Sequence, residues 1–170
     1  VGCPAIELHF GETMNLTMGL RKAVRFGADA EALVCGDVRL DRRTFVDRVA
    51  RLASVLRDLG MGDGDRVAML AANGHRYVEF YFAVLWGGGV IVPVNSRFAL
   101  PEMIEQARDA EPVVLIGDET FAGIGEELAR LRPSRFHRLD GPGVTIGQAG
   151  GAPGEQHAGA ERLGDVVVGA

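Results

Sequence analysis

Apolar and polar residues recur along this chain with the spacings of alternating helices and strands. The strongest helical pattern covers residues 42–59, where apolar positions return after three or four residues. Those positions are Phe45, Val49, Leu52, Leu56 and Leu59. Arg48 and most other charged residues of this range lie off the stripe. Asp41 is placed to cap the start of the helix, and Gly60 is placed to end it.

Three short apolar runs that follow this helix are typical of buried strands. They cover residues 66–70, 90–92 and 113–116, and Pro93 closes the second of them. Residues 76–86 lie between the first two runs and are apolar almost all round, which predicts a buried helix.

Two further helices and a weak edge strand are expected toward the carboxyl-terminal side. Pro101 suits the first turn of a helix, because its missing N–H is not needed there. The residues expected on the inner face of this helix are Leu100, Ile104 and Ala107. Residues 121–131 carry a fourth helical stripe, and residues 135–139 read as an edge strand.

The amino-terminal part of the chain is less regular. Residues 1–13 show no clear period, and we interpret them as an extension of uncertain origin. A helical pattern begins near Met14, with Asn15 as a candidate cap and Leu16, Leu20 and Val24 as its apolar positions. Two β-like runs then flank Gly36-Asp37, which predicts a small hairpin over residues 32–40.

Strands that alternate with helices predict an α/β fold with a parallel sheet flanked by helices. The small hairpin precedes this sheet. We expect residues 14–140 to form this α/β unit. Residues 141–170 are rich in glycine and poor in periodic apolar positions, which favours a linker.

Composition and charge narrow the function classes. The net charge of -5 argues against a nucleic-acid-binding protein. Two cysteines and four widely separated histidines give neither a disulfide framework nor the spacing of a metal site. The longest uncharged and mostly apolar run, residues 80–94, is interrupted by glycines and is shorter than the ~20 residues that a membrane helix needs. We therefore expect no transmembrane segment and a cytoplasmic location.

Three glycine clusters invite a phosphate-binding interpretation, at residues 60–65, 87–89 and 141–154. A phosphate loop needs a strand, then glycines, then a helix, so that the anion meets the positive end of the helix. The first two clusters follow helices and precede strands, which predicts plain turns. The third lacks both a good preceding strand and the Lys-Ser/Thr ending of a phosphate loop.

No arrangement of side chains stands out as a catalytic centre. Glu126-Glu127 are adjacent on a predicted helix and do not face each other, so they read as a solvated surface. Asp63 and Asp65 flank a turn glycine and are expected to make local turn hydrogen bonds. The aromatic residues of the 76–86 helix, which include Trp86, favour core packing over a wall for an acyl chain.

The stretch from Leu40 to Asp118 resembles the opening portion of adenylate-forming enzymes, and most closely acyl-CoA synthetases and CoA ligases. The matching landmarks occur in the family's order. They are Leu59-Gly60, Gly64-Asp65-Arg66-Val67-Ala68, Asn73, residues 87–93, Asn95-Ser96-Arg97-Phe98, residues 102–104 and the VVLIGD run that ends at Asp118. Asp41-Arg42 stands where the family usually has Thr-Tyr, and Gly88-Gly89 replaces the more usual Gly-Ala.

The resemblance implies an N-terminal portion of an ATP-dependent acyl-CoA synthetase. Enzymes of this kind adenylate a fatty or aryl carboxylic acid and then form a thioester with coenzyme A, using ATP and Mg²⁺. The family's phosphate loop, its adenine-binding residues and its catalytic lysine have no counterpart in this chain. Lys22 is the only lysine and reads as a surface residue. We therefore assign no catalytic, cofactor-binding or metal-binding residue, and we expect the isolated chain to be inactive.

Asp65, Asn73, Asn95 and Arg97 match the family's pattern, and we interpret them as structural residues that satisfy turns and strand ends. The expected partner is the remainder of the ligase chain, and the organisation also allows a homo-oligomer. Two alternatives stay open. One is a non-enzymatic α/β fragment that binds a protein partner through an uncovered sheet edge. The other is a small-molecule-binding domain that uses the ends of its strands.

Overall fold

The computed structural model describes residues 16–130 and short strands at residues 135–138, 145–146, 162–163 and 166–167. Helix α1 (Met18–Gly27) precedes a hairpin of β1 (Glu31–Cys35) and β2 (Val38–Asp41). The central elements are α2 (Arg42–Asp58), β3 (Arg66–Leu70), α3 (His75–Trp86), β4 (Val90–Pro93), α4 (Leu100–Ala110), β5 (Val114–Gly117), the 3-10 turn η1 (Glu119–Phe121), α5 (Ala122–Arg130) and β6 (Arg135–Arg138).

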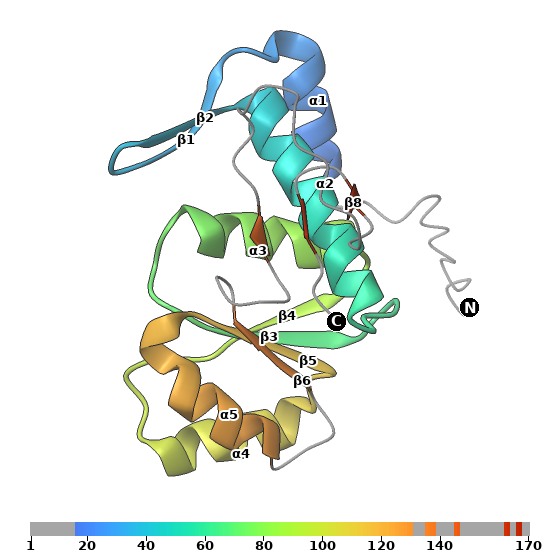
Figure 1. Ribbon diagram of the computed structural model, residues 1–170. Helices are drawn as coiled ribbons and strands as arrows, with labels where there is room; N and C mark the ends of the chain where they lie inside the picture. The colour runs from blue at the N-terminus through green and yellow to red at the C-terminus, as the bar shows by residue number, and fades with distance from the viewer. Residues whose placement is uncertain (1–15, 131–134, 139–144, 147–161, 164–165, 168–170) are drawn as a thin grey trace, which may run out of the picture.

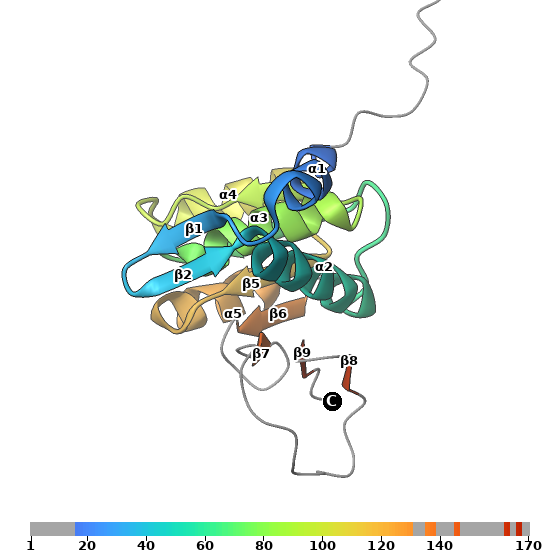
Figure 2. The ribbon, with the colours of Figure 1, turned by 90° about the horizontal axis from the view of Figure 1, so that it is seen from above.

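Four of these strands form one parallel sheet in the order β4-β3-β5-β6. Helices α2 and α3 cover one face of this sheet, and α4 and α5 cover the other (Figure 1). Figure 2 shows the β1–β2 hairpin extending beside the helices rather than joining the sheet. The predicted α/β class, parallel sheet and hairpin are therefore confirmed.

Alternate residues of the central strands feed two separate apolar clusters. Val67 and Met69 of β3 point toward α2 and α3, while Ala68 and Leu70 point toward α4 and α5. All four side chains are buried, since both sides of a parallel sheet are covered by helices. The near-continuous apolar runs of the sequence reflect this two-sided burial.

The start of α2 is built as the sequence predicts. The Asp41 carboxylate accepts a hydrogen bond from the backbone N–H of Thr44 at 2.7 Å. This bond, followed by the side-chain contact with Thr44, lowers the pKa of Asp41 because it favours the charged form. Helix α1 begins later than expected, with Thr17 as its cap, and Asn15 lies outside the described residues.

Three burial predictions are wrong in detail. Helix α3 is not buried all round, because Val78 and Tyr81 face solvent with 37% and 40% exposure. Leu100 of α4 is also 37% exposed, and Met103 is the residue that this helix buries. Arg48 does not lie off the apolar stripe of α2 but is buried within it. The three errors share one cause, because the sequence pattern of one element does not reveal which neighbouring elements cover it.

The glycine-rich range after residue 140 contains three two-residue strands. They are β7 (Thr145–Ile146), β8 (Arg162–Leu163) and β9 (Val166–Val167), which pair antiparallel in the order β7-β9-β8. The remainder of the range lies outside the described residues, as do Leu131 and residue 139. The proposed boundaries at residues 14 and 140 and the linker role stay predictions. Among the described residues, no helix is long and apolar enough to cross a bilayer.

Candidate functional site

The strand order places a topological switch point between β3 and β5. The chain leaves β3 toward β4 on one side, and it leaves β5 toward β6 on the other. In open α/β sheets, ligands bind at the carboxyl ends of strands where such a reversal occurs. The carboxyl ends of β3 and β5 are therefore the first place to look for a functional site.

Asp118 occupies this switch point and joins the two strand ends. Its Oδ2 atom accepts a hydrogen bond from the backbone N–H of Ala72 at 2.8 Å. Its Oδ1 atom accepts from the N–H of Phe121 at 3.2 Å and so caps η1. Its own N–H donates to the carbonyl of Leu70 at 3.3 Å. A carboxylate held in this way stabilises the strand ends and disfavours a bound phosphate.

The loop after β4 is held by local hydrogen bonds of the same kind. The Asn95 side-chain oxygen accepts from the backbone N–H of Arg97 at 3.0 Å, which confirms its predicted structural role. The Glu102 carboxylate accepts from the N–H of Ala99 at 2.8 Å and caps α4. Arg97 is exposed on this loop, and Asn73 is exposed in the bend after β3. The structural role that we predicted for these two residues stays a prediction.

Helix α3 begins at the same edge with His75, above a buried ion pair. The Nε and Nη2 atoms of Arg48 donate to the two carboxylate oxygens of Glu79 at 3.1 and 3.0 Å. The side chain of Glu79 is fully buried and that of Arg48 is 10% exposed. Partial burial lowers the pKa of His75, although the nearby Glu79 charge opposes that shift. The bidentate pair links α2 to α3 within the core.

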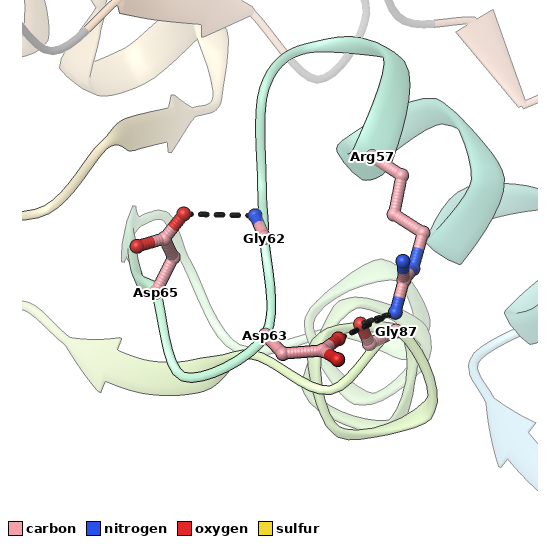
Figure 3. Close-up of polar contacts among 5 residues, drawn as sticks. All are labelled: Arg57, Gly62, Asp63, Asp65 and Gly87. Atoms are coloured by element: carbon pink, nitrogen blue, oxygen red, sulfur yellow. Dashed lines mark hydrogen bonds and ion pairs between the residues drawn. The ribbon is translucent and has the colours of Figure 1, made fainter.

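The glycine clusters at residues 60–65 and 87–89 lie at the opposite, amino edge of the sheet. Figure 3 shows Arg57 reaching from the end of α2 to Asp63 and to the carbonyl oxygen of Gly87, each at 2.7 Å. Asp65 accepts from the N–H of Gly62 at 2.8 Å, as predicted for a turn aspartate. Asp63 instead pairs with the Arg57 side chain, which corrects its predicted local role.

Close packing explains why glycines stand in the second cluster. A Cβ atom on Gly89 would lie 2.7 Å from the sulfur of Met61 and 3.2 Å from the carbonyl oxygen of Asp65. Gly88 has a φ of 85°, in the left-handed region that favours glycine. The interpretation of both clusters as helix-to-strand turns is confirmed.

Neither described glycine cluster fits a bound phosphate. Both described glycine clusters follow the carboxyl ends of helices, where the dipole is negative and repels phosphate. Lys22 is exposed on α1, as predicted, and α1 contacts α2 rather than the sheet. Within the same described part of the chain, no group of three or more His, Cys, Asp or Glu side chains could hold a metal ion.

The remaining candidates take the structural roles that the sequence favoured. Glu126 is exposed and Glu127 pairs with Arg130 one turn away, at 3.1 Å. Among the aromatic residues of α3, Phe80 is fully buried and Phe82 meets the ring of Phe45 edge-on, with 5.8 Å between centroids. These rings form core rather than an open wall.

Sequence reasoning missed two features. The Arg48–Glu79 pair left a weak signal, because a glutamate interrupts the otherwise apolar run of α3 and Arg48 lies between Phe45 and Leu52 of the stripe. The role of Asp118 left none, since it depends on the β3–β5 pairing.

Comparisons with known proteins agree with this fold. The family model described as AMP-binding enzyme matches residues 20–159. A feruloyl-CoA synthase of an Amycolatopsis species is 36% identical over 118 residues, which are 69% of this chain and 23% of that protein. This chain thus spans about a quarter or less of the length of the curated relatives it matches.

Solved structures give the same result. The N-terminal domain of FACL13 from Mycobacterium tuberculosis matches 75% of this chain with a TM-score of 0.69 and 26% identity, over 34% of that chain. ATP-bound MatB from Rhodopseudomonas palustris matches 74% of it with a TM-score of 0.68 and 25% identity, over 25% of that chain. Because the family model covers most of the chain and the fold agrees with it, the chain belongs to the AMP-binding enzyme family.

Proposed function

We propose that this chain is the scaffold-forming N-terminal portion of an ATP-dependent ligase that joins a carboxylic acid to coenzyme A. The observation that carries the proposal is the 36% identity with a feruloyl-CoA synthase over two thirds of the chain. The parent enzyme would adenylate a fatty or aryl acid and then form a thioester, with ATP, Mg²⁺ and coenzyme A as its reactants and cofactors. Its expected location is the cytoplasm.

Within that enzyme, this portion supplies structure rather than chemistry. Asp118 holds the switch point through backbone hydrogen bonds. At the amino edge, the Met61 side chain packs against Gly87 and Gly89, and Arg57 donates a hydrogen bond to the carbonyl oxygen of Gly87. The nucleotide would be held by other parts of the parent protein. The isolated chain is therefore expected neither to adenylate an acid nor to bind ATP tightly.

The first test is the native protein, captured from its cells with an antibody against this chain. We expect an intact mass well above 18.1 kDa and formation of AMP that requires both a carboxylic acid and coenzyme A. A native mass of 18.1 kDa without such activity would overturn the proposal. A panel of fatty and aryl acids in the same assay identifies the substrate class.

The second test addresses the scaffold role. The purified 170-residue chain should give no carboxylate-dependent ATP–pyrophosphate exchange. A chimera that carries residues 14–140 in place of the matching region of the feruloyl-CoA synthase should form feruloyl-CoA. The same chimera with Leu56→Asp, which places a charge in the core, serves as the inactive control. Exchange by the chain alone would refute the scaffold role while leaving the ligase assignment intact.

The alternative of a protein partner added at the sheet edge receives little support from β4, the edge strand beside β3. Pro93 has no N–H to donate, and its carbonyl already accepts a hydrogen bond from the Gln106 side chain at 2.9 Å. Proline is one of the usual means by which an edge strand resists further pairing. Asp118 likewise disfavours an anionic small molecule at the switch point.

A further inference from the structure

Helix α1 displays exposed apolar side chains beside its cations. Phe26 is 85% exposed and Met18 is 45% exposed, and Leu16 just before the helix is 73% exposed. Phe26 has the highest exposure among the large apolar residues of the described part of the chain. Core packing does not account for these residues.

The helical period separates two faces of α1. Leu20 packs against the main core cluster and marks the inner face. Met18, Lys22 and Arg25 follow one another at spacings of four and three and share the outer face, with Phe26 at its border. All four residues are exposed.

The inner side of α1 is fixed to the rest of the molecule. Arg42 Nη1 donates to the carbonyl oxygens of Ala23 and Gly27 at 3.3 and 3.4 Å. The Arg21 guanidinium lies 4.5 Å from the centre of the Trp86 ring. Figure 1 shows α1 at one end of the molecule beside α2, away from the four-stranded sheet. The outer face is thus held in one orientation and turned away from the core.

The charge of this helix is opposite to that of the whole chain. Arg21, Lys22 and Arg25 lie within α1, which contains no acidic residue, whereas the full chain carries a net charge of -5. The outer face therefore combines cations with apolar side chains and presents no carboxylate of its own.

We propose that this face, formed by Met18, Lys22, Arg25 and Phe26, docks on the surface of an anionic lipid bilayer. Interfacial helices combine lysine and arginine with phenylalanine and other apolar residues, so that cations meet lipid headgroups while rings enter the acyl boundary. Methionine, arginine and phenylalanine are also enriched at protein interfaces, so an interface between copies of this chain is the outcome that the test must separate from lipid binding. The contact is peripheral and reversible, as a ten-residue helix implies.

This docking goes beyond the ligase activity and does not depend on it. It would place a cytoplasmic enzyme for apolar acids beside the membrane in which such acids dissolve. Vesicle binding and AMP formation are measured separately, so the failure of one leaves the other standing.

The test is flotation of the 170-residue chain with vesicles of phosphatidylcholine, with and without phosphatidylglycerol. We expect binding only to the anionic vesicles, with weakening as salt rises. Lys22→Glu/Arg25→Glu should lower the partition coefficient by about thirtyfold or more, since each cation contributes about fivefold near such a surface.

A matched pair of double variants isolates the surface. Arg25→Glu/Phe26→Ser should lose most of the binding, while Arg97→Glu/Phe98→Ser makes the same two substitutions on the β4–α4 loop and should retain it. Circular dichroism checks that both variants fold. Equal loss in the two variants, or no binding by the unaltered chain, would overturn the proposal. So would a concentration-dependent dimer that the α1 variant alone dissociates, because the face would then be an interface between copies.

Discussion

The two faces of the parallel sheet are covered in physically different ways. Helices α2 and α3 bury a large apolar cluster that encloses the Arg48–Glu79 ion pair. Helices α4 and α5 bury a smaller cluster, and its buried members are all apolar. The first face therefore combines hydrophobic burial with one directional contact that fixes how two helices meet. The second relies on apolar packing, which tolerates changes of side chain more easily.

The largest expected effect tests that directional contact. Glu79→Ala should lower the free energy of unfolding by about 3–5 kcal/mol, because it leaves the buried Arg48 charge without its carboxylate. The matched variant Arg48→Met/Glu79→Leu removes both charges and should be more stable than Glu79→Ala. Urea denaturation followed by circular dichroism measures both. A loss below about 1 kcal/mol for Glu79→Ala would mean that the pair does not distinguish the two faces.

A smaller loss is expected where the first face meets the amino edge. Gly89→Ala would place a Cβ atom 3.0 Å from a methyl group of Val84 and 3.2 Å from the Asp65 carbonyl oxygen. The backbone cannot move away freely, because the Gly89 N–H donates to the carbonyl of Val84 at 2.9 Å. We expect a loss of about 1–3 kcal/mol in the same urea assay. An unchanged midpoint would show that this turn is less tightly packed than its distances indicate.

The second face offers a substitution of opposite sign. Gly123 lies in α5, and a Cβ atom added there would meet nothing within 4 Å. Gly123→Ala should therefore raise the free energy of unfolding by about 0.5–1 kcal/mol, since alanine loses less backbone entropy in a helix. Thermal denaturation of the two glycine variants side by side gives the contrast directly. A destabilised Gly123→Ala would mean that this position of α5 is more crowded than its distances indicate.

The same contrast explains how far the sequence could predict the fold. The strand at residues 66–70 was predicted residue for residue, because both of its faces are buried and its apolar run is unbroken. The cap at Asp41 was predictable, since it depends on residues three apart in the chain. Features that depend on residues within one element can be predicted without knowing which elements pack against it.

What escaped prediction depends on contacts between distant elements. Arg48 and Glu79 are 31 residues apart, and only the packing of α2 on α3 brings them together. Asp118 reaches Ala72 across 46 residues, through the pairing of β5 with β3. The burial of Met103 in place of Leu100 has the same origin, because it depends on how α4 packs in the second apolar cluster. Such features depend on tertiary structure, so the periodicity of the sequence does not reveal them.

The smallest expected effect concerns pH and again separates the two faces. Partial burial holds the pKa of His75 below its ordinary value of 6.5, helped by the charges of Arg76 and Arg48 and opposed by Glu79. The unfolded chain therefore binds a proton at a higher pH than the folded chain does. The contribution of His75 to stability is complete above about pH 6.5 and is lost as the pH falls through the folded pKa.

His75→Asn removes this pH-dependent contribution to stability. Helices α4 and α5, on the other face of the sheet, contain no histidine. The urea midpoint should fall less between about pH 7.5 and 5.5 in the variant than in the unaltered chain. Carboxylates titrate in both proteins and cancel in the difference. A variant with the same pH slope as the unaltered chain would mean that His75 is solvated well enough to accept its proton without cost to the α2–α3 face.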